Sequence, residues 1–160
     1  MYLKFINKLA LIFYPLVNSM MKARWHNNPF VKQPGGSEED YRKLWRQAKE
    51  TKSFAVEELE KNLGFAVDSE WLNDLSLVTQ ISIKPSSPNF DHGRVLYSTL
   101  RAYTEKLNKG AAELTIVETG TARGFSSICM AKALKDANIS GRIITFDVLP
   151  HNVKMFWNAI

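Results

Sequence analysis

Cysteine is nearly absent from this sequence. Cys129 is the only one among 160 residues, so an intramolecular disulfide is impossible and no thiolate cluster can hold a metal ion. This cysteine usage fits a reducing, cytoplasmic compartment best. Cys129 falls in a stretch with helical spacing, and we expect it to be a small buried hydrophobe.

The chain also lacks a concentration of charge of one sign. Its net charge is +5, from 21 Lys and Arg against 16 Asp and Glu, but no Lys/Arg run of the kind found in nucleic-acid patches occurs. We therefore expect no nucleic-acid partner. Hydrophobic residues make up 45% of the chain, which is typical of a globular protein with a real core and argues against disorder.

A long uninterrupted hydrophobic run is missing as well. Residues 2–21 are the most apolar part, but their core, Leu9–Val17, is far shorter than the roughly 20 residues of a spanning helix and contains Pro15. No small-x-small cleavage site of a signal peptide follows. The segment fits a helix packed on protein, or an interfacial helix whose flanking Lys and Arg face anionic headgroups. We expect a cytoplasmic protein, with peripheral membrane contact through residues 2–21 as the open alternative.

Three regions are predicted along the chain. Residues 1–36 form the apolar segment and a Pro/Gly-rich connector, and residues 37–110 form a mainly helical extension. Residues 111–160 begin an α/β domain. Within the extension, helices are expected from Ser37, from near Ser53 to a stop at Gly64, over 68–75 and over 91–108, with a β-rich stretch over 77–83.

Two features of the extension bear on function. The charges Glu57, Glu58, Glu60 and Lys61 are predicted to form a solvated face. The paired glutamates are not expected to act as an acid–base pair, because adjacent positions on a helix do not point at each other. His92 stands at the start of the 91–108 helix, just before the strand that feeds the central loop. It either reaches a ligand in the cleft or simply caps or packs.

The stretch that carries most chemistry is Leu114–Gly124, reading LTIVETGTARG. Its first six residues have the continuous apolar character of a parallel strand covered on both faces. A small-residue turn, 120–124, leads into a helix over 125–138. This helix has Ile128, Ala131 and Leu134 on one side, and Gly141 is predicted to end it. Residues 142–148 form a second strand that delivers an acidic residue at its carboxyl end.

The turn suits an anionic ligand. Gly120 can take backbone angles closed to other residues, and Ser126 and Ser127 offer hydroxyls and free N–H groups at the positive end of the following helix. The small residues alternate as G-x-A-x-G, unlike the G-x-G-x-x-G of dinucleotide folds. Asp147 is placed to accept hydrogen bonds from a ribose diol. A generic strand-to-helix turn and an exposed strand-end residue remain the alternatives, and Arg123 is predicted to be solvated.

The order of strand, small-residue loop, helix and strand ending in Asp resembles the class I, Rossmann-like S-adenosylmethionine-dependent methyltransferases over residues 114–148. IVETGTARGFSS with TFDVLPH is similar to a bacterial group that includes sugar- and natural-product-modifying methyltransferases and their cephalosporin-hydroxylase-type relatives. The resemblance implies that the loop wraps the methionine part of the cofactor and that the strand-end acid binds its ribose. Ala122 departs from the usual Gly. The implied cofactor-binding residues are Glu118, Thr119, Gly120, Thr121, Ala122, Gly124, Ser126, Ser127 and Asp147.

The resemblance implies a seven-stranded sheet, of which this chain supplies the first two strands and their helices. We therefore expect a truncated S-adenosylmethionine-dependent methyltransferase acting on a small-molecule acceptor, with no catalytic base assigned. Two alternatives stay open. One is a metal-dependent oxygenase-like relative, although no carboxylate–histidine cluster is apparent. The other is a non-catalytic, degenerate Rossmann-like domain tethered to a membrane by residues 2–21.

Overall fold

The computed structural model describes residues 35–107 and 113–147, which form five helices and two strands. In chain order these are α2 (Glu38–Lys49), α3 (Phe54–Leu63), α4 (Ser69–Thr79), α5 (Asp91–Glu105), β1 (Leu114–Thr119), α6 (Phe125–Asp136) and β2 (Gly141–Phe146). The predicted α/β class is therefore confirmed for this part of the chain. The predictions for residues 2–21, for the connector as far as residue 34 and for residues 148–160 lie outside the described residues.

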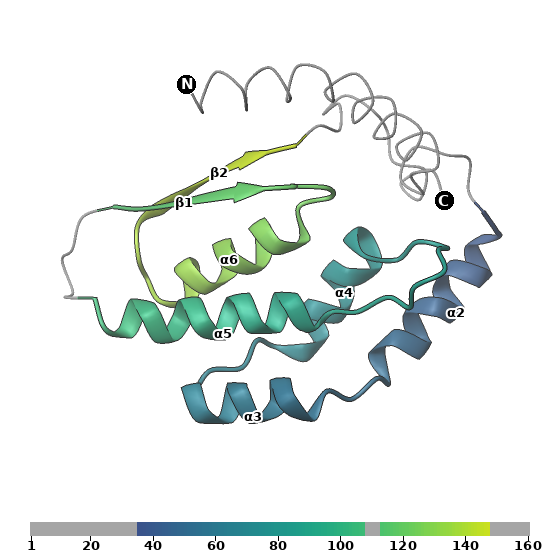
Figure 1. The fold of residues 1–160 in the computed structure, drawn as a ribbon, viewed down its shortest axis with the longest axis horizontal. Helices are drawn as coiled ribbons and strands as arrows, with labels where there is room; N and C mark the ends of the chain where they lie inside the picture. Colours follow the sequence, from purple (N-terminus) through teal and green to yellow (C-terminus); the bar gives the residue numbers. More distant parts are fainter. Residues whose placement is uncertain (1–34, 108–112, 148–160) are drawn as a thin grey trace, which may run out of the picture.

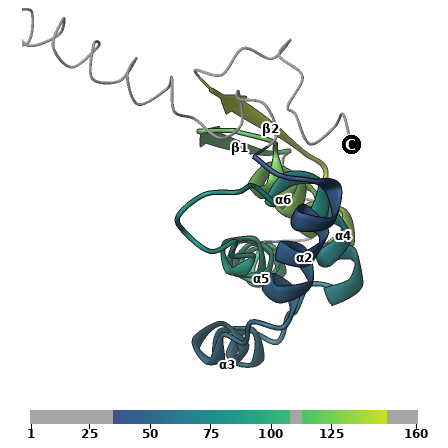
Figure 2. The ribbon, with the colours of Figure 1, turned by 90° about the vertical axis from the view of Figure 1, so that its right-hand side faces the viewer.

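The two strands form a parallel pair that pairs Leu114 with Gly141 and Thr119 with Phe146. Figures 1 and 2 show the elements stacked in layers: the sheet lies against α6, α6 lies against α5, and α3 lies on the far side of α5. The helices α2 and α4 pack at one end of this stack. A β–α–β unit thus rests on a helical layer built from the front half of the chain.

Only one face of the sheet is covered by α6. Along β1 the residues alternate between half-buried and exposed, and Val117 is 64% exposed. The last residues of β2 alternate in the same way, and its final residue, Phe146, is 59% exposed. The prediction that the first strand is covered on both faces is therefore wrong, because its apolar run presents every second side chain to the face opposite α6.

The core lies between the α/β unit and the helical front half. Gly93 of α5 is buried and faces α6, where a Cβ atom would stand 2.5 Å from Phe125 Cε1 and 2.8 Å from Cys129 Sγ. Cys129 is fully buried, as predicted. The buried cluster consists of Val67, Leu72, Ile81, Phe90, Tyr97, Phe125, Cys129 and Ala133.

Capping interactions explain where α2 begins and where α3 ends. The Ser37 hydroxyl accepts from the backbone N–H of Asp40 at 3.3 Å, and the Asp40 carboxylate accepts from the backbone N–H of Ser37 at 2.8 Å. This reciprocal pair is a capping box. Gly64 ends α3 in the left-handed conformation, with φ of 77°. Both termini were predicted from the sequence, and both predictions are confirmed.

The predicted β-rich stretch over 77–83 is wrong. The helix that Asp68 caps, through its bond to the N–H of Trp71 at 2.7 Å, continues to Thr79. The hydroxyls of Ser76 and Thr79 bond back to carbonyls of the same helix, and Leu72 is buried in the core. Strand propensity depends on a neighbouring strand, and helical packing prevails here.

Two further predictions are corrected. Glu60 does not belong to a solvated face: it is buried and accepts two hydrogen bonds from Arg94 of α5, at 3.0 Å and 2.5 Å. Gly141 does not close the helix predicted over 125–138, because it is the first residue of β2. Asn138, with φ of 54°, takes the left-handed conformation just after α6 instead.

The buried thiol of Cys129 should make the protein less stable at alkaline pH. Burial raises the pKa of Cys129 from 9.0 to about 12, so as the pH rises above 9.0 the unfolded chain loses a proton that the folded chain keeps. We expect the free energy of unfolding to fall with a slope approaching about 1.4 kcal/mol per pH unit. Denaturant titrations at successive pH values measure it. The same slope in Cys129→Ala would show that another group causes the loss.

No helix within residues 35–107 or 113–147 has the length and apolar character needed to cross a membrane.

Candidate functional site

The predicted loop lies at the carboxyl end of the parallel strand pair. β1 ends at Thr119, and the N–H of Gly120 donates to the carbonyl of Phe146, the last residue of β2, at 2.7 Å. The chain then turns within five residues into α6, and the N–H of Gly124 donates to the carbonyl of Thr121 at 2.7 Å. This edge is where open α/β sheets hold their ligands.

The alternate spacing of small residues in the loop has a direct conformational cause. Gly120, Ala122 and Gly124 have φ values of 84°, 45° and 81°, so each takes the left-handed region that most residues avoid. The two intervening residues do not. The G-x-A-x-G spacing therefore marks a loop in which every second residue has a positive φ. At Ala122 this conformation is strained, because its Cβ atom crowds the backbone.

Replacing Ala122 with glycine should stabilise the protein by about 0.5–1 kcal/mol, because the relief of left-handed strain exceeds the added entropy of the unfolded chain. Chemical denaturation measures the change. Ala131→Gly, at an exposed position inside α6, is the matched control and should destabilise by about 1 kcal/mol. If Ala122→Gly is less stable than the parent protein, the backbone at residue 122 is not strained by its Cβ atom.

Asp147 directly follows β2 and is brought against the loop. One of its carboxylate oxygens, Oδ2, accepts a hydrogen bond from the N–H of Ala122 at 2.5 Å. A charged acceptor makes this bond stronger than a neutral one. The strand-end acid and the loop, 25 residues apart in the sequence, therefore form one site.

Glu118 is joined to the other side of the loop. The hydroxyl of Ser127, in the first turn of α6, donates to Oε2 of Glu118 near the end of β1. The bond spans the loop from its entrance to its exit. Thr119 and Ser126 make no side-chain hydrogen bond with the residues that the structure describes. Of the nine predicted residues, two pairs are thus joined through a side chain, and Thr121 and Gly124 are joined through their backbones.

The amino end of α6 presents backbone donors to the same site. Its N-cap is Gly124, which has no side chain to accept a bond, and the first helical bond runs from the N–H of Ile128 to the carbonyl of Gly124. The N–H groups of the preceding first turn therefore have no partner within the helix. With the positive end of the helix dipole, they favour a negatively charged group.

Arg123 is not the solvated residue that the sequence predicted. Its Nη1 donates to the carbonyl of Ile81 at 3.3 Å, and burial lowers the pKa of its guanidinium to about 10. The loop is thereby fastened to the segment that follows α4. No spacing rule links residues 42 positions apart, so sequence reasoning missed this contact.

His92 packs on the first residue of α6. The ring centroids of His92 and Phe125 are 4.7 Å apart and their planes are inclined by 60°. Burial lowers the pKa of His92 below 6.5, although the nearby carboxylates of Asp91 and Glu118 oppose that shift. The structure shows His92 in the packing role, near Glu118, the next-to-last residue of β1.

Within residues 35–107 and 113–147, no group of three or more His, Cys, Asp or Glu side chains is placed to hold a metal ion. A scan against protein-family models, a search of curated proteins and a search of solved structures each found no match to the chain.

Proposed function

We propose that the chain binds S-adenosylmethionine at the 120–124 loop and takes part in methyl transfer to a small-molecule acceptor. The observation that carries this proposal is the contact of Asp147 with the N–H of Ala122. It brings a strand-end acid to a loop of three left-handed residues at the carboxyl edge of a parallel pair. We also infer that β1, α6 and β2 belong to a Rossmann-like sheet.

The chemistry of the available groups fits the two ends of this cofactor. The first-turn N–H groups of α6 and the hydroxyl of Ser126 suit the carboxylate of the methionine part. The Glu118 carboxylate suits its ammonium group, and Asp147 suits a ribose diol. Gly120 has no atom within 4 Å of where a Cβ would stand, so the loop backbone is open to close approach at that point.

The part of the site that these residues form works by binding and orientation. S-adenosylmethionine supplies an electrophilic methyl group when bound. Glu118 is held by Ser127 and Asp147 is held by Ala122, so both acceptors are preorganised before a ligand arrives. Fixing the cofactor in one position lowers the entropic cost of an in-line displacement.

Calorimetric titration with S-adenosylmethionine tests the proposal. We expect Asp147→Ala to weaken binding about 10- to 100-fold, because a charge-assisted hydrogen bond is lost. Asp147→Asn keeps an acceptor oxygen for Ala122 but loses the charge, so its affinity should fall between those of the parent and the alanine variant. Glu113→Ala is the matched control, since Glu113 is an exposed acid at the opposite end of the strand pair.

Glu113→Ala should bind with the affinity of the parent protein. If Asp147→Ala also does so, Asp147 has no part in binding and the ribose assignment fails. If the parent protein shows no saturable binding, the cofactor assignment fails altogether.

A further inference from the structure

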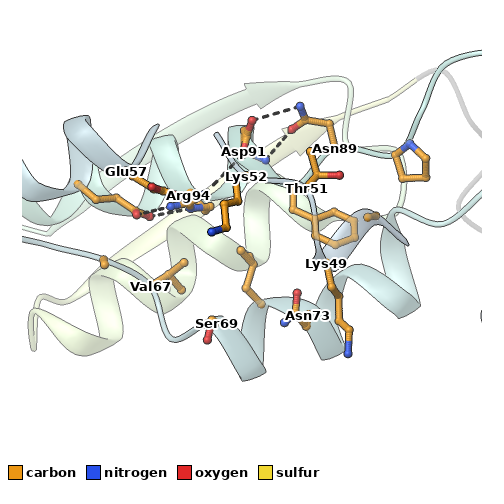
Figure 3. A pocket seen from close by; sticks show the side chains of 16 residues that line it. Lys49, Thr51, Lys52, Glu57, Val67, Ser69, Asn73, Asn89, Asp91 and Arg94 are labelled. Atoms are coloured by element: carbon orange, nitrogen blue, oxygen red, sulfur yellow. Dashed lines mark hydrogen bonds and ion pairs between the residues drawn. The ribbon is translucent and has the colours of Figure 1, made fainter. Parts of the chain in front are cut away.

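A hollow of about 370 Å³ lies on the other side of α5 from α6. Gly93 of α5 faces α6, whereas Arg94 points the other way and bonds to Glu60 of α3. The hollow is bordered by the end of α2, by α3 and by the amino ends of α4 and α5 (Figure 3). It shares no residue with the 120–124 loop.

The hollow combines an apolar surface with a fixed ion pair. Val67, Leu72 and Phe90 line it, and all three are buried members of the core cluster. The guanidinium of Arg94 donates through Nε and Nη2 to both carboxylate oxygens of Glu60, and its Nη1 lies 3.7 Å from Asp91. Arg94 is therefore already neutralised by its protein neighbours.

Three further charged side chains line the hollow, and one of them, Lys49, has its ammonium 4.1 Å from the centre of the Trp45 ring. Lys52 and Glu57 both line it, and Figure 3 shows them with the Arg94 cluster. Within the described part of the chain, neither side chain forms a hydrogen bond or an ion pair with another residue.

We propose that this hollow binds a small zwitterion with an apolar side chain, of the α-amino acid class. Lys52 pairs with the carboxylate, Glu57 pairs with the ammonium group, and the side chain lies against Phe90. Glu60 and Asp91 face Arg94, and the ammonium of Lys49 lies over the Trp45 ring. The charges left for a ligand are therefore one cation and one carboxylate, so a ligand carrying both charges fits best. This site is independent of the cofactor proposal.

Titration of the full chain with L-leucine tests this site, followed by calorimetry or by amide chemical shifts. A ligand of this size should bind with a Kd on the order of 1 mM. Two probes of the same shape each lack one charge: 3-methylbutylamine has no carboxylate and 4-methylpentanoate has no ammonium group. Each should bind at least about tenfold more weakly, since each loses one charged hydrogen-bonded pair.

Variants locate the binding. Lys52→Ala and Glu57→Ala should each weaken L-leucine binding about tenfold, whereas Lys43→Ala and Glu58→Ala, at exposed positions outside the hollow, should leave it unchanged. Asp147→Ala should also leave it unchanged, which separates this result from the cofactor test. The proposal is overturned if L-leucine shows no saturable binding, if both single-charge probes bind as tightly, or if neither pocket variant weakens it.

Discussion

Replacing Gly93 with valine should destabilise the fold by about 3 kcal/mol, because a side chain at this position of α5 would clash with α6. A Cβ atom at residue 93 would stand 2.5 Å and 2.7 Å from ring carbons of Phe125, and 2.8 Å from Cys129 Sγ. All three atoms belong to buried side chains. The two helices would have to separate. The amino end of α6, which begins at Phe125 and forms part of the candidate site, would then shift.

Chemical denaturation of the variant series measures this effect. Gly93→Ala should lie between the parent and the valine variant, because alanine's better helix propensity offsets part of the clash. Thr99→Val, which places the same side chain at an exposed position of the same helix, should change stability by less than about 0.5 kcal/mol. Adding Phe125→Leu to Gly93→Ala should recover stability. A Gly93→Val variant as stable as the parent would show that α5 and α6 do not meet here.

Removing Glu60 should cost about 3 kcal/mol, because Arg94 would lose both hydrogen bonds that hold its guanidinium. The side chains of Arg94 and Glu60 are 20% and 10% exposed, so water replaces the lost carboxylate poorly. The pair joins α3 to α5, and its loss should loosen α3 first. Thermal and chemical denaturation of Glu60→Ala measure the change.

A double variant distinguishes an ion pair from ordinary packing. Glu60→Leu with Arg94→Leu removes both charges, and we expect it to be close to the parent in stability, since apolar pairs often replace buried ion pairs without cost. The single variant Glu60→Leu should remain destabilised because it leaves Arg94 unpaired. Equal stability of the single and double variants would contradict the role assigned to this pair.

Local signals in the sequence predicted two of the helix termini and the order of the α/β unit. The capping residue Ser37 and the stop at Gly64 act on their own backbone, so their effect can be read without tertiary information. The alternate spacing of small residues also predicted a special backbone. The structure gives its cause in the φ values of Gly120, Ala122 and Gly124.

Features set by packing could not be predicted in the same way. The spacing placed Ile128 and Leu134 on one side of α6, yet Ile128 is 40% exposed and Leu134 is buried, and the fully buried residues are Cys129 and Ala133. The helix is apolar on several sides, so its sequence does not say which side meets α5. The burial of Glu60 likewise depends on Arg94, 34 residues later, and no local pattern links the two.

The most direct test of the central claim is a titration of the isotope-labelled chain with S-adenosylmethionine, followed by backbone amide chemical shifts. We predict saturable shifts at Gly120, Ala122 and Gly124 and in the first turn of α6, with residues of α3 unaffected. The Asp147→Ala variant should show these shifts only at about 10- to 100-fold higher concentration. Saturable shifts confined to residues away from the loop, or none at all, would contradict the account.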